Sequence, residues 1–184
     1  MKITSIDIFK AIVESPTPGW FPICVRVNTD EGICGWGESG IPVMSGRDAT
    51  MTMISEIAPF ILGMDPLDHE VIWQKLYNGS YWAYGGGPIP FAAISALDIA
   101  LWDIKGKALS VPVYELLGGK TRDKVRVYAS VMHITEDKNE LAAQYQQLQQ
   151  MGFTAAKIFC NGPTSSSDGK GEFFSSRIER EVEK

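Results

Sequence analysis

Lys157 is a candidate catalytic residue because it interrupts an otherwise apolar segment. Residues 153–159, Phe-Thr-Ala-Ala-Lys-Ile-Phe, are typical of a strand that is buried on both faces of a parallel sheet. Lys157 falls near the C-terminal end of this segment, and enzymes built on parallel strands carry their catalytic groups at that end. The same spacing also fits a structural lysine whose side chain reaches solvent past the sheet edge. The residues alone leave both interpretations open.

Two other features resemble anion-binding elements. The guanidinium of Arg47 can hold an acid or hydroxyl group bidentately, although most single arginines are simply solvated. The run Gly85-Gly86-Gly87 precedes a predicted helix, as in phosphate-binding loops. Because this run lacks the Lys-Ser/Thr ending of a P-loop and follows no buried strand, we exclude a phosphate site there.

Composition and charge exclude several classes of protein. The net charge is −5 and the lysines and arginines are scattered singly, so we expect no nucleic-acid partner. No apolar run reaches the ~18 residues of a membrane span, and residues 1–10 alternate instead of forming a signal-peptide core. We therefore expect no membrane association and a cytoplasmic location. The three cysteines show no metal-ligand spacing, and their odd number argues against a disulfide framework.

The first forty residues predict an antiparallel sheet. Ile6, Ile8 and Ile12 share one face of an extended segment. The next strand repeats this pattern with Ile23, Val25 and Val27, and residues 28–32 form a turn into a third strand over residues 33–38.

Three helices are predicted to follow the sheet. Asp48 caps a helix that ends near Pro59, and Asp65-Pro66 starts a second helix. The apolar side of this second helix is predicted to comprise Leu67, Val71, Trp73, Leu76 and Tyr77. A third and longer helix follows Pro88, and its many alanines permit close packing, so we expect it at the centre of the domain. Its apolar stripe is Phe91, Ile94, Leu97, Leu101, Ile104 and Ala108.

A βαβ unit is predicted from residue 125 onward. Residues 125–131 form a strand, residues 140–151 form a helix that ends at Gly152, and residues 153–159 form the second strand. A further helix starts near Ser175 and has no C-terminal signal at residue 184, so we expect the chain to be cut within an element. The predicted domains are residues 1–124 and 125–184.

Two ordered segments carry a family resemblance. Residues 96–108, Ala-Leu-Asp-Ile-Ala-Leu-Trp-Asp-Ile-Lys-Gly-Lys-Ala, and residues 111–119, Val-Pro-Val-Tyr-Glu-Leu-Leu-Gly-Gly, resemble the mandelate racemase/muconate lactonizing family of the enolase superfamily. The run as a whole is most similar to acid-sugar dehydratases of the galactonate dehydratase kind. The resemblance implies an α+β capping domain, with a three-stranded antiparallel sheet and a helical bundle, followed by the truncated start of a (β/α)₈ barrel.

The resemblance also implies a reaction. Family members abstract the proton α to a substrate carboxylate, and Mg²⁺ held by three carboxylates stabilises the enediolate. Those carboxylates lie at the ends of the third to fifth barrel strands, so this chain is expected to contain no metal ligand. We expect the 184-residue chain to be inactive on its own.

Lys157 departs from the racemase pattern of the family. Racemases and lactonizing enzymes carry Lys-x-Lys at this position, whereas this chain has Lys157-Ile158-Phe159. The missing second lysine argues against two-base racemisation and favours Lys157 as a contact to the carboxylate or enediolate. The general base is then expected beyond Lys184.

By resemblance, two loops of the capping domain close the mouth of the barrel. The matching segments are residues 16–21, with Trp20 facing the substrate, and residues 44–47, with Arg47. Trp82, Tyr84 and His133 are further candidates for lining the cleft. Ordinary loop packing is the alternative for Trp20, packing on the central helix for Trp82 and Tyr84, and solvent exposure for His133.

Two classes of function stay open. The first is a sugar-acid dehydratase, a hydro-lyase that acts on a small carboxylate, with racemase, epimerase or cycloisomerase chemistry as its alternative within the superfamily. The second is a non-catalytic capping module that acts in assembly. Family habit also implies a homo-oligomer.

Overall fold

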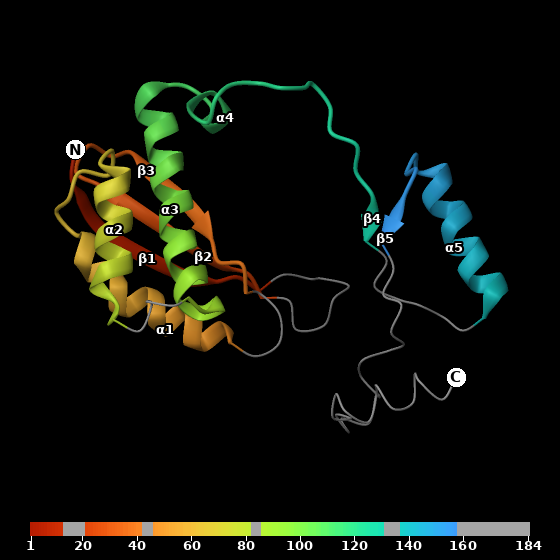
Figure 1. Ribbon diagram of the computed structural model, residues 1–184, viewed down its shortest axis with the longest axis horizontal. Helices are drawn as coiled ribbons and strands as arrows, with labels where there is room; N and C mark the ends of the chain where they lie inside the picture. The colour runs from red at the N-terminus through yellow and green to blue at the C-terminus, as the bar shows by residue number, and fades with distance from the viewer. Residues whose placement is uncertain (13–20, 42–45, 82–85, 131–136, 158–184) are drawn as a thin grey trace. The chain divides into compact units, whose positions relative to one another are not determined.

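The computed structural model describes residues 1–12, 21–41, 46–81, 86–130 and 137–157. The chain divides into two compact units, Met1–Thr121 and Arg122–Lys184. Figure 1 shows the elements of each unit. No helix within the described ranges has the length and apolarity that a membrane span requires.

Alternating apolar residues build the sheet of the first unit. Strands β1 (Ile3–Lys10), β2 (Ile23–Thr29) and β3 (Cys34–Glu38) pair in this order, and both pairings are antiparallel. The predicted antiparallel sheet is therefore confirmed. Gly32 has a φ of 78° in the β2–β3 turn, where a side chain would be strained.

One residue of the predicted first strand does not belong to it. Ile12 lies two residues beyond the end of β1 and is 88% exposed, so its assignment to the apolar face was wrong. Ile3, at the other end of β1, is buried. A shift in register between Ile3 and Ser5 adds a residue to β1 relative to β2, and this extra residue brings Ile3 to the buried face.

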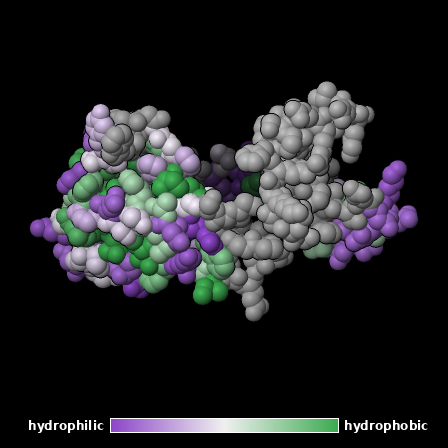
Figure 2. Space-filling model, turned by 90° about the horizontal axis from the view of Figure 1, so that it is seen from below, coloured by the Kyte–Doolittle hydropathy of each residue, from purple (hydrophilic) through white to green (hydrophobic). Residues whose placement is uncertain are grey.

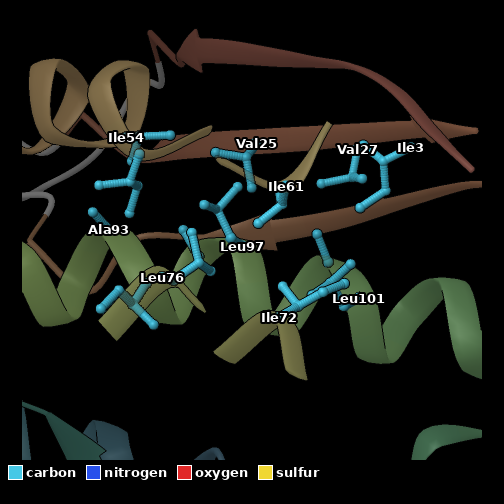
Figure 3. Close-up of a cluster of buried hydrophobic side chains, with 14 of the residues drawn as sticks. Ile3, Val25, Val27, Ile54, Ile61, Ile72, Leu76, Ala93, Leu97 and Leu101 are labelled. Carbon is cyan, nitrogen blue, oxygen red and sulfur yellow. The ribbon is translucent and has the colours of Figure 1, made fainter. Parts of the chain in front are cut away.

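Helix α3 (Pro88–Leu109) covers the inner face of the sheet, as predicted, with Ile94, Leu97, Leu101 and Ile104 of the predicted stripe buried. Phe91 of that stripe is 38% exposed, so its assignment to the buried face was wrong. Figure 3 shows Leu97 and Leu101 of α3 meeting Val25 and Val27 of β2 in the core. The contact is close because β3 presents glycines to the helix. Its inward-facing residues are Gly35 and Gly37, and a Cβ on either would fall within about 2 Å of an α3 carbonyl oxygen, as near as 1.9 Å for Gly37.

Helix α1 (Arg47–Ile57) begins two residues earlier than predicted. Its N-cap is Gly46, with a φ of 101°, and Asp48 lies in the first turn instead of capping it. A short 3₁₀ helix, η1 (Ala58–Ile61), follows directly with Pro59 in its first turn. A proline in the first turn of a helix needs no backbone N–H donor. Pro59 is therefore accommodated at the start of η1, directly after the end of α1.

Helix α2 (His69–Gly79) corrects a second predicted helix start. Asp65 accepts a hydrogen bond from the Leu67 amide at 3.0 Å and caps a turn, whereas the helix N-cap is Asp68. The buried face also differs in part from the predicted apolar side, of which Leu76 is fully buried. Its buried residues are His69, Ile72 and Leu76, whereas Val71 and Trp73 of the predicted apolar side are 58% and 36% exposed.

The first unit ends with α4 (Val113–Leu116), and the second unit contains the βαβ elements. Strands β4 (Ala129–Ser130) and β5 (Ala156–Lys157) pair in parallel, with α5 (Lys138–Gln150) between them in sequence. The Asp137 carboxylate caps α5, and Gly152, with a φ of 91°, follows its end. The connection is therefore βαβ.

The predicted strand over residues 125–131 is much shorter than expected. Val125 and Val127 are 68% and 60% exposed and precede β4, because β-structure forms only where a neighbouring strand supplies hydrogen bonds. The remainder of that prediction, and the helix expected near Ser175, lie outside the described residues.

Candidate functional site

One end of the first unit contains described residues that adjoin the candidate segments of the capping domain. At this end β1 finishes and β2 starts, and the Ala11 amide donates to the Pro22 carbonyl at 2.8 Å. The Ser39 amide donates to the Ile23 carbonyl, also at 2.8 Å, so the chain leaving β3 starts beside the same strand. We call this region the loop end, defined by residues 11–12, 21–23, 39–41, 46–48 and 86–89.

Arg47 and Phe21 join two candidate segments at the loop end. The guanidinium carbon of Arg47 lies 4.5 Å from the centroid of the Phe21 ring, a cation–π contact. Phe21 is the last residue of the first predicted lid segment, and Arg47 is the last residue of the second. Segments that are about 25 residues apart in sequence therefore meet through these two side chains.

Helix α1 is fixed to the loop end on both sides of Arg47. A Cβ on Gly46 would lie 3.3 Å from the side chain of Ile89, so little space separates the start of α1 from the start of α3. The Lys10 ammonium contacts the Asp48 carboxylate at 2.9 Å. Its hydrogen bond, followed by its charge, holds the pKa of Asp48 below the usual range. The start of α1 therefore lies close to the start of α3 and contacts β1 through a solvent-exposed ion pair.

The start of α3 lies at the same end, and in sequence it follows the predicted cleft residues Trp82 and Tyr84. Gly86 and Gly87 have φ values of 89° and 126° and lead directly into the helix. Phe91 in the first turn of α3 contacts Tyr77 of α2 with ring centroids 6.0 Å apart. The start of α3 thus packs against α2 through an aromatic contact within the first unit. In Figure 2, hydrophobic and hydrophilic residues lie side by side on the face of this unit turned to the viewer.

The structure places two of the six predicted site residues. Arg47 is half-buried in the first unit, and Lys157 is exposed in the second unit, where it pairs in register with Ser130. The other four lie outside the described residues: Trp20, Trp82, Tyr84 and His133.

Sequence reasoning missed Phe21 and the Lys10–Asp48 pair. An arginine and an aromatic ring 26 positions apart carry no periodic signal, because their contact depends on the path of two loops. The only available hint was that Phe21 directly follows Trp20 in a segment broken by prolines and glycine.

The described residues do not fit a magnesium site. Within the described ranges, no three His, Cys, Asp or Glu side chains gather closely enough to hold a metal ion. Asp48 is the one carboxylate among the residues that define the loop end, and it is paired with Lys10.

A pocket of about 330 Å³ near the C-terminal end of α3 offers no better site. Its charged lining residues, Asp103 and Lys107, form an ion pair at 2.7 Å. Lys107 also donates to the Cys34 carbonyl at 2.8 Å, and Asp103 accepts from the Trp36 amide at 2.9 Å. These polar atoms already hold β3 against α3, so their role is structural.

A family model for the mandelate racemase/muconate lactonizing enzyme N-terminal domain matches residues 21–118. These residues contain β2, β3, the helices of the first unit and most of the loop end described above. The chain belongs to this family. The first unit is accordingly the α+β capping domain of the enolase superfamily, as the resemblance implied.

Individual proteins of known name or structure are also similar to this chain. The chain is 42% identical over 159 residues to a D-galactonate dehydratase from Pectobacterium atrosepticum, a match that covers 86% of this chain and 38% of the relative. The crystal structure of an enolase-superfamily member from Salmonella Typhimurium superposes with a TM-score of 0.79 at 36% identity, covering 97% of this chain and 48% of that one.

A relative with different chemistry is also similar. The 3,6-anhydro-D-galactonate cycloisomerase from Zobellia galactanivorans superposes with a TM-score of 0.72 at 32% identity, covering 85% of this chain and 42% of that one. The chain thus spans less than half the length of each of these three relatives.

Proposed function

We propose that this chain supplies the capping domain and the first βαβ unit of a sugar-acid dehydratase. The observation that supports it is the meeting of two candidate lid segments through Arg47 and Phe21, in a chain 42% identical over 159 residues to a D-galactonate dehydratase. The substrate is then a small sugar-acid carboxylate. The proposed boundary between capping domain and barrel lies between residues 124 and 125.

The proposed reaction removes one proton and one hydroxyl group. A base takes the proton α to the carboxylate, the electron pair enters the enediolate, and the β-hydroxyl leaves as water after receiving a proton. The resulting enol then becomes the keto acid. Metal chemistry, with Mg²⁺ neutralising the enediolate, requires carboxylate ligands that the described residues do not provide.

The residues of this chain hold and enclose the substrate in this proposal. Arg47 binds a carboxylate or hydroxyl group from the capping side, and Trp20 covers the substrate. Lys157 contacts the carboxylate or enediolate at the end of the second barrel strand. Trp82, Tyr84 and His133 line the same cleft. We also propose that the protein acts in the cytoplasm as a homo-oligomer.

A chimera tests this proposal directly. Residues 1–157 replace the corresponding segment of the Pectobacterium D-galactonate dehydratase, which contributes the rest of its chain. We expect the purified chimera to dehydrate D-galactonate to a keto acid and to lose activity in EDTA. The 184-residue chain assayed alone should show no turnover.

Variants of the chimera test the two described site residues. Arg47→Ala and Lys157→Met should each lower kcat/KM by about 10- to 100-fold, because each removes a charged contact to the substrate. The charge-matched controls are Lys75→Ala and Lys138→Ala, two exposed positions that should leave kcat/KM unchanged. Equal activities of site and control variants would remove these residues from the proposed site.

Cycloisomerase chemistry is the second candidate, and it is favoured by the Zobellia relative at 32% identity. An active chimera that converts 3,6-anhydro-D-galactonate faster than D-galactonate would support it over dehydration. A folded chimera that converts neither compound would instead favour the non-catalytic capping module.

A further inference from the structure

Among the described residues, the hydrophobic core cluster lies wholly within the first unit. It begins at Ile3 in β1 and ends at Ile104 in α3. In the described part of the second unit, Ala129 is the only buried hydrophobic residue, and α5 has no buried residue at all. A unit that buries its own core can fold without its neighbour. The core of the first unit therefore needs no residue of the second.

The second unit begins with an exposed segment, residues 122–128, that has no regular secondary structure. Every residue in it is exposed, and no backbone–backbone hydrogen bond joins it to another described residue. Basic residues alternate along this segment at Arg122, Lys124 and Arg126, and Arg126 donates to the Thr154 hydroxyl at 2.9 Å. Because its backbone is exposed and unpaired, a protease can bind this segment without first unfolding a domain.

Exposed basic residues in the elements of the first unit are less accessible to a protease. Lys75 lies within α2 and Lys107 lies within α3, where the backbone is hydrogen-bonded. Such a backbone must open locally before it can be cleaved. Outside the described residues, ranges 13–20, 42–45 and 82–85 of the first unit contain no lysine or arginine. A protease that cuts after basic residues is therefore expected to act first near the start of the second unit.

We infer that the bond between Lys124 and Val125 is a cleavage site for proteases of trypsin-like specificity, and that the first unit stays folded after the cut. Water adds across this peptide bond and leaves a carboxylate on Lys124 and an amino group on Val125. These proteases bind a lysine or arginine side chain in a pocket that contains a carboxylate. Because Arg47 precedes the cut and Lys157 follows it, cleavage places these two candidate site residues on different fragments. The inference does not depend on the proposed reaction.

Limited trypsin digestion of the 184-residue chain, with the fragments identified by intact mass, tests this inference. We expect a persistent fragment that begins at Met1 and ends at Lys120, Arg122 or Lys124, three exposed basic residues outside helices and strands. All five tryptophans precede residue 103, so their fluorescence during urea unfolding reports on this fragment. The midpoint of its unfolding transition should match that of the uncut chain.

Variants separate the basic side chains from the exposure of the backbone. The triple variant K120Q/R122Q/K124Q should release this fragment about 10-fold or more slowly, because the protease pocket loses its cation. Lys75→Gln, which removes an exposed lysine from α2, should leave the rate unchanged. Chymotrypsin, which binds an apolar or aromatic side chain instead, should cut after Tyr128 equally fast in the parent and the triple variant.

The two parts of the inference fail in different ways. Cuts after Lys75 or Lys107 that precede any cut within residues 120–126 would overturn the cleavage site, and so would resistance of that whole range to trypsin. A fragment that ends at Lys124 but no longer unfolds cooperatively would overturn the independent stability of the first unit. If the triple variant does not fold, the digest of the parent chain decides both parts by itself.

Discussion

The Asp103 carboxylate of α3 accepts a hydrogen bond from the Trp36 amide of β3 at 2.9 Å. The same oxygen, Oδ2, lies 2.7 Å from the Lys107 ammonium, and that ammonium also donates to the Cys34 carbonyl at 2.8 Å. One carboxylate thus joins the edge strand of the sheet to the central helix. This arrangement explains how a strand with two inward-facing glycines stays attached to the domain.

Removing this carboxylate should weaken the capping unit. We expect Asp103→Ala to lower the free energy of unfolding by about 1–3 kcal/mol, because a backbone donor loses a charged acceptor. Lys107→Met should cost less than about 1 kcal/mol, since an exposed ion pair contributes little. All five tryptophans fall between residues 20 and 102, so tryptophan fluorescence during urea unfolding reports on the first unit alone. Equal losses for both variants would contradict this assignment.

The close approach of β3 to α3 predicts intolerance of a single methyl group. A Cβ on Gly37 would lie 1.9 Å from the Ala96 carbonyl oxygen, which is backbone and has no rotamer to change. We expect Gly37→Ala to lower the free energy of unfolding by roughly 3 kcal/mol or more. Gly40→Ala is the matched control, because no atom lies within 4 Å of its Cβ position. Urea unfolding that gives similar values for the two variants would show that the helix can move away.

Patterns within one element predicted the capping domain well. The apolar stripe lies on α3, a helix of 22 residues, so one misplaced residue could not change the buried face. The start of α2 was wrong because Asp65 and Asp68 are both suitable caps, and only the packing of Ile72 and Leu76 selects between them. Local signals decide an element's type more strongly than its first residue.

The candidate site was less predictable than the fold. Arg47 could be chosen for its chemistry, but its contact with Phe21 joins residues 26 positions apart, which no pattern within one element specifies. For Lys157 the sequence left exposure and function equally open, and the structure shows an exposed residue on a two-residue strand. Its role as a substrate contact remains a prediction that the chimera tests.

The C-cap residue of α3 predicts a stabilising substitution. Ser110 is the C-cap and has a φ of 56°, a left-handed conformation that favours glycine. We expect Ser110→Gly to raise the free energy of unfolding by about 0.5–1 kcal/mol. Ser55→Gly, in the middle of α1, should instead lower it by about 0.5 kcal/mol. A loss of stability at Ser110 would mean that its side chain makes a contact that outweighs the backbone strain.

His69 predicts a pH dependence of folding. It is 6% exposed on α2, and its ring meets the Trp102 ring edge-on with centroids 4.4 Å apart. Neither ring nitrogen has a hydrogen-bond partner of good geometry among the described residues. Burial lowers the pKa of His69, and the nearby Leu101 carbonyl and Asp98 carboxylate only partly oppose that effect. The folded state therefore binds the His69 proton less readily than the unfolded state does.

The sign of the effect follows from this difference. Above a pH of about 6.5 the histidine is neutral in both states and does not affect stability. As the pH falls through this value toward the lower pKa of the folded state, the unfolded state takes up more protons and stability is lost. Asp98 acts in the opposite direction, because burial raises its pKa.

Urea unfolding between pH 5.5 and 7.5, followed by tryptophan fluorescence, should show the free energy of unfolding falling as the pH is lowered. His69→Phe keeps a ring beside Trp102 and removes the titration, so its stability should change less over this range. Asp98→Asn should steepen the loss, since it removes a charge that favours the protonated histidine. If the parent and His69→Phe show equal slopes, the pH dependence arises elsewhere in the chain and His69 takes up its proton without cost to the fold.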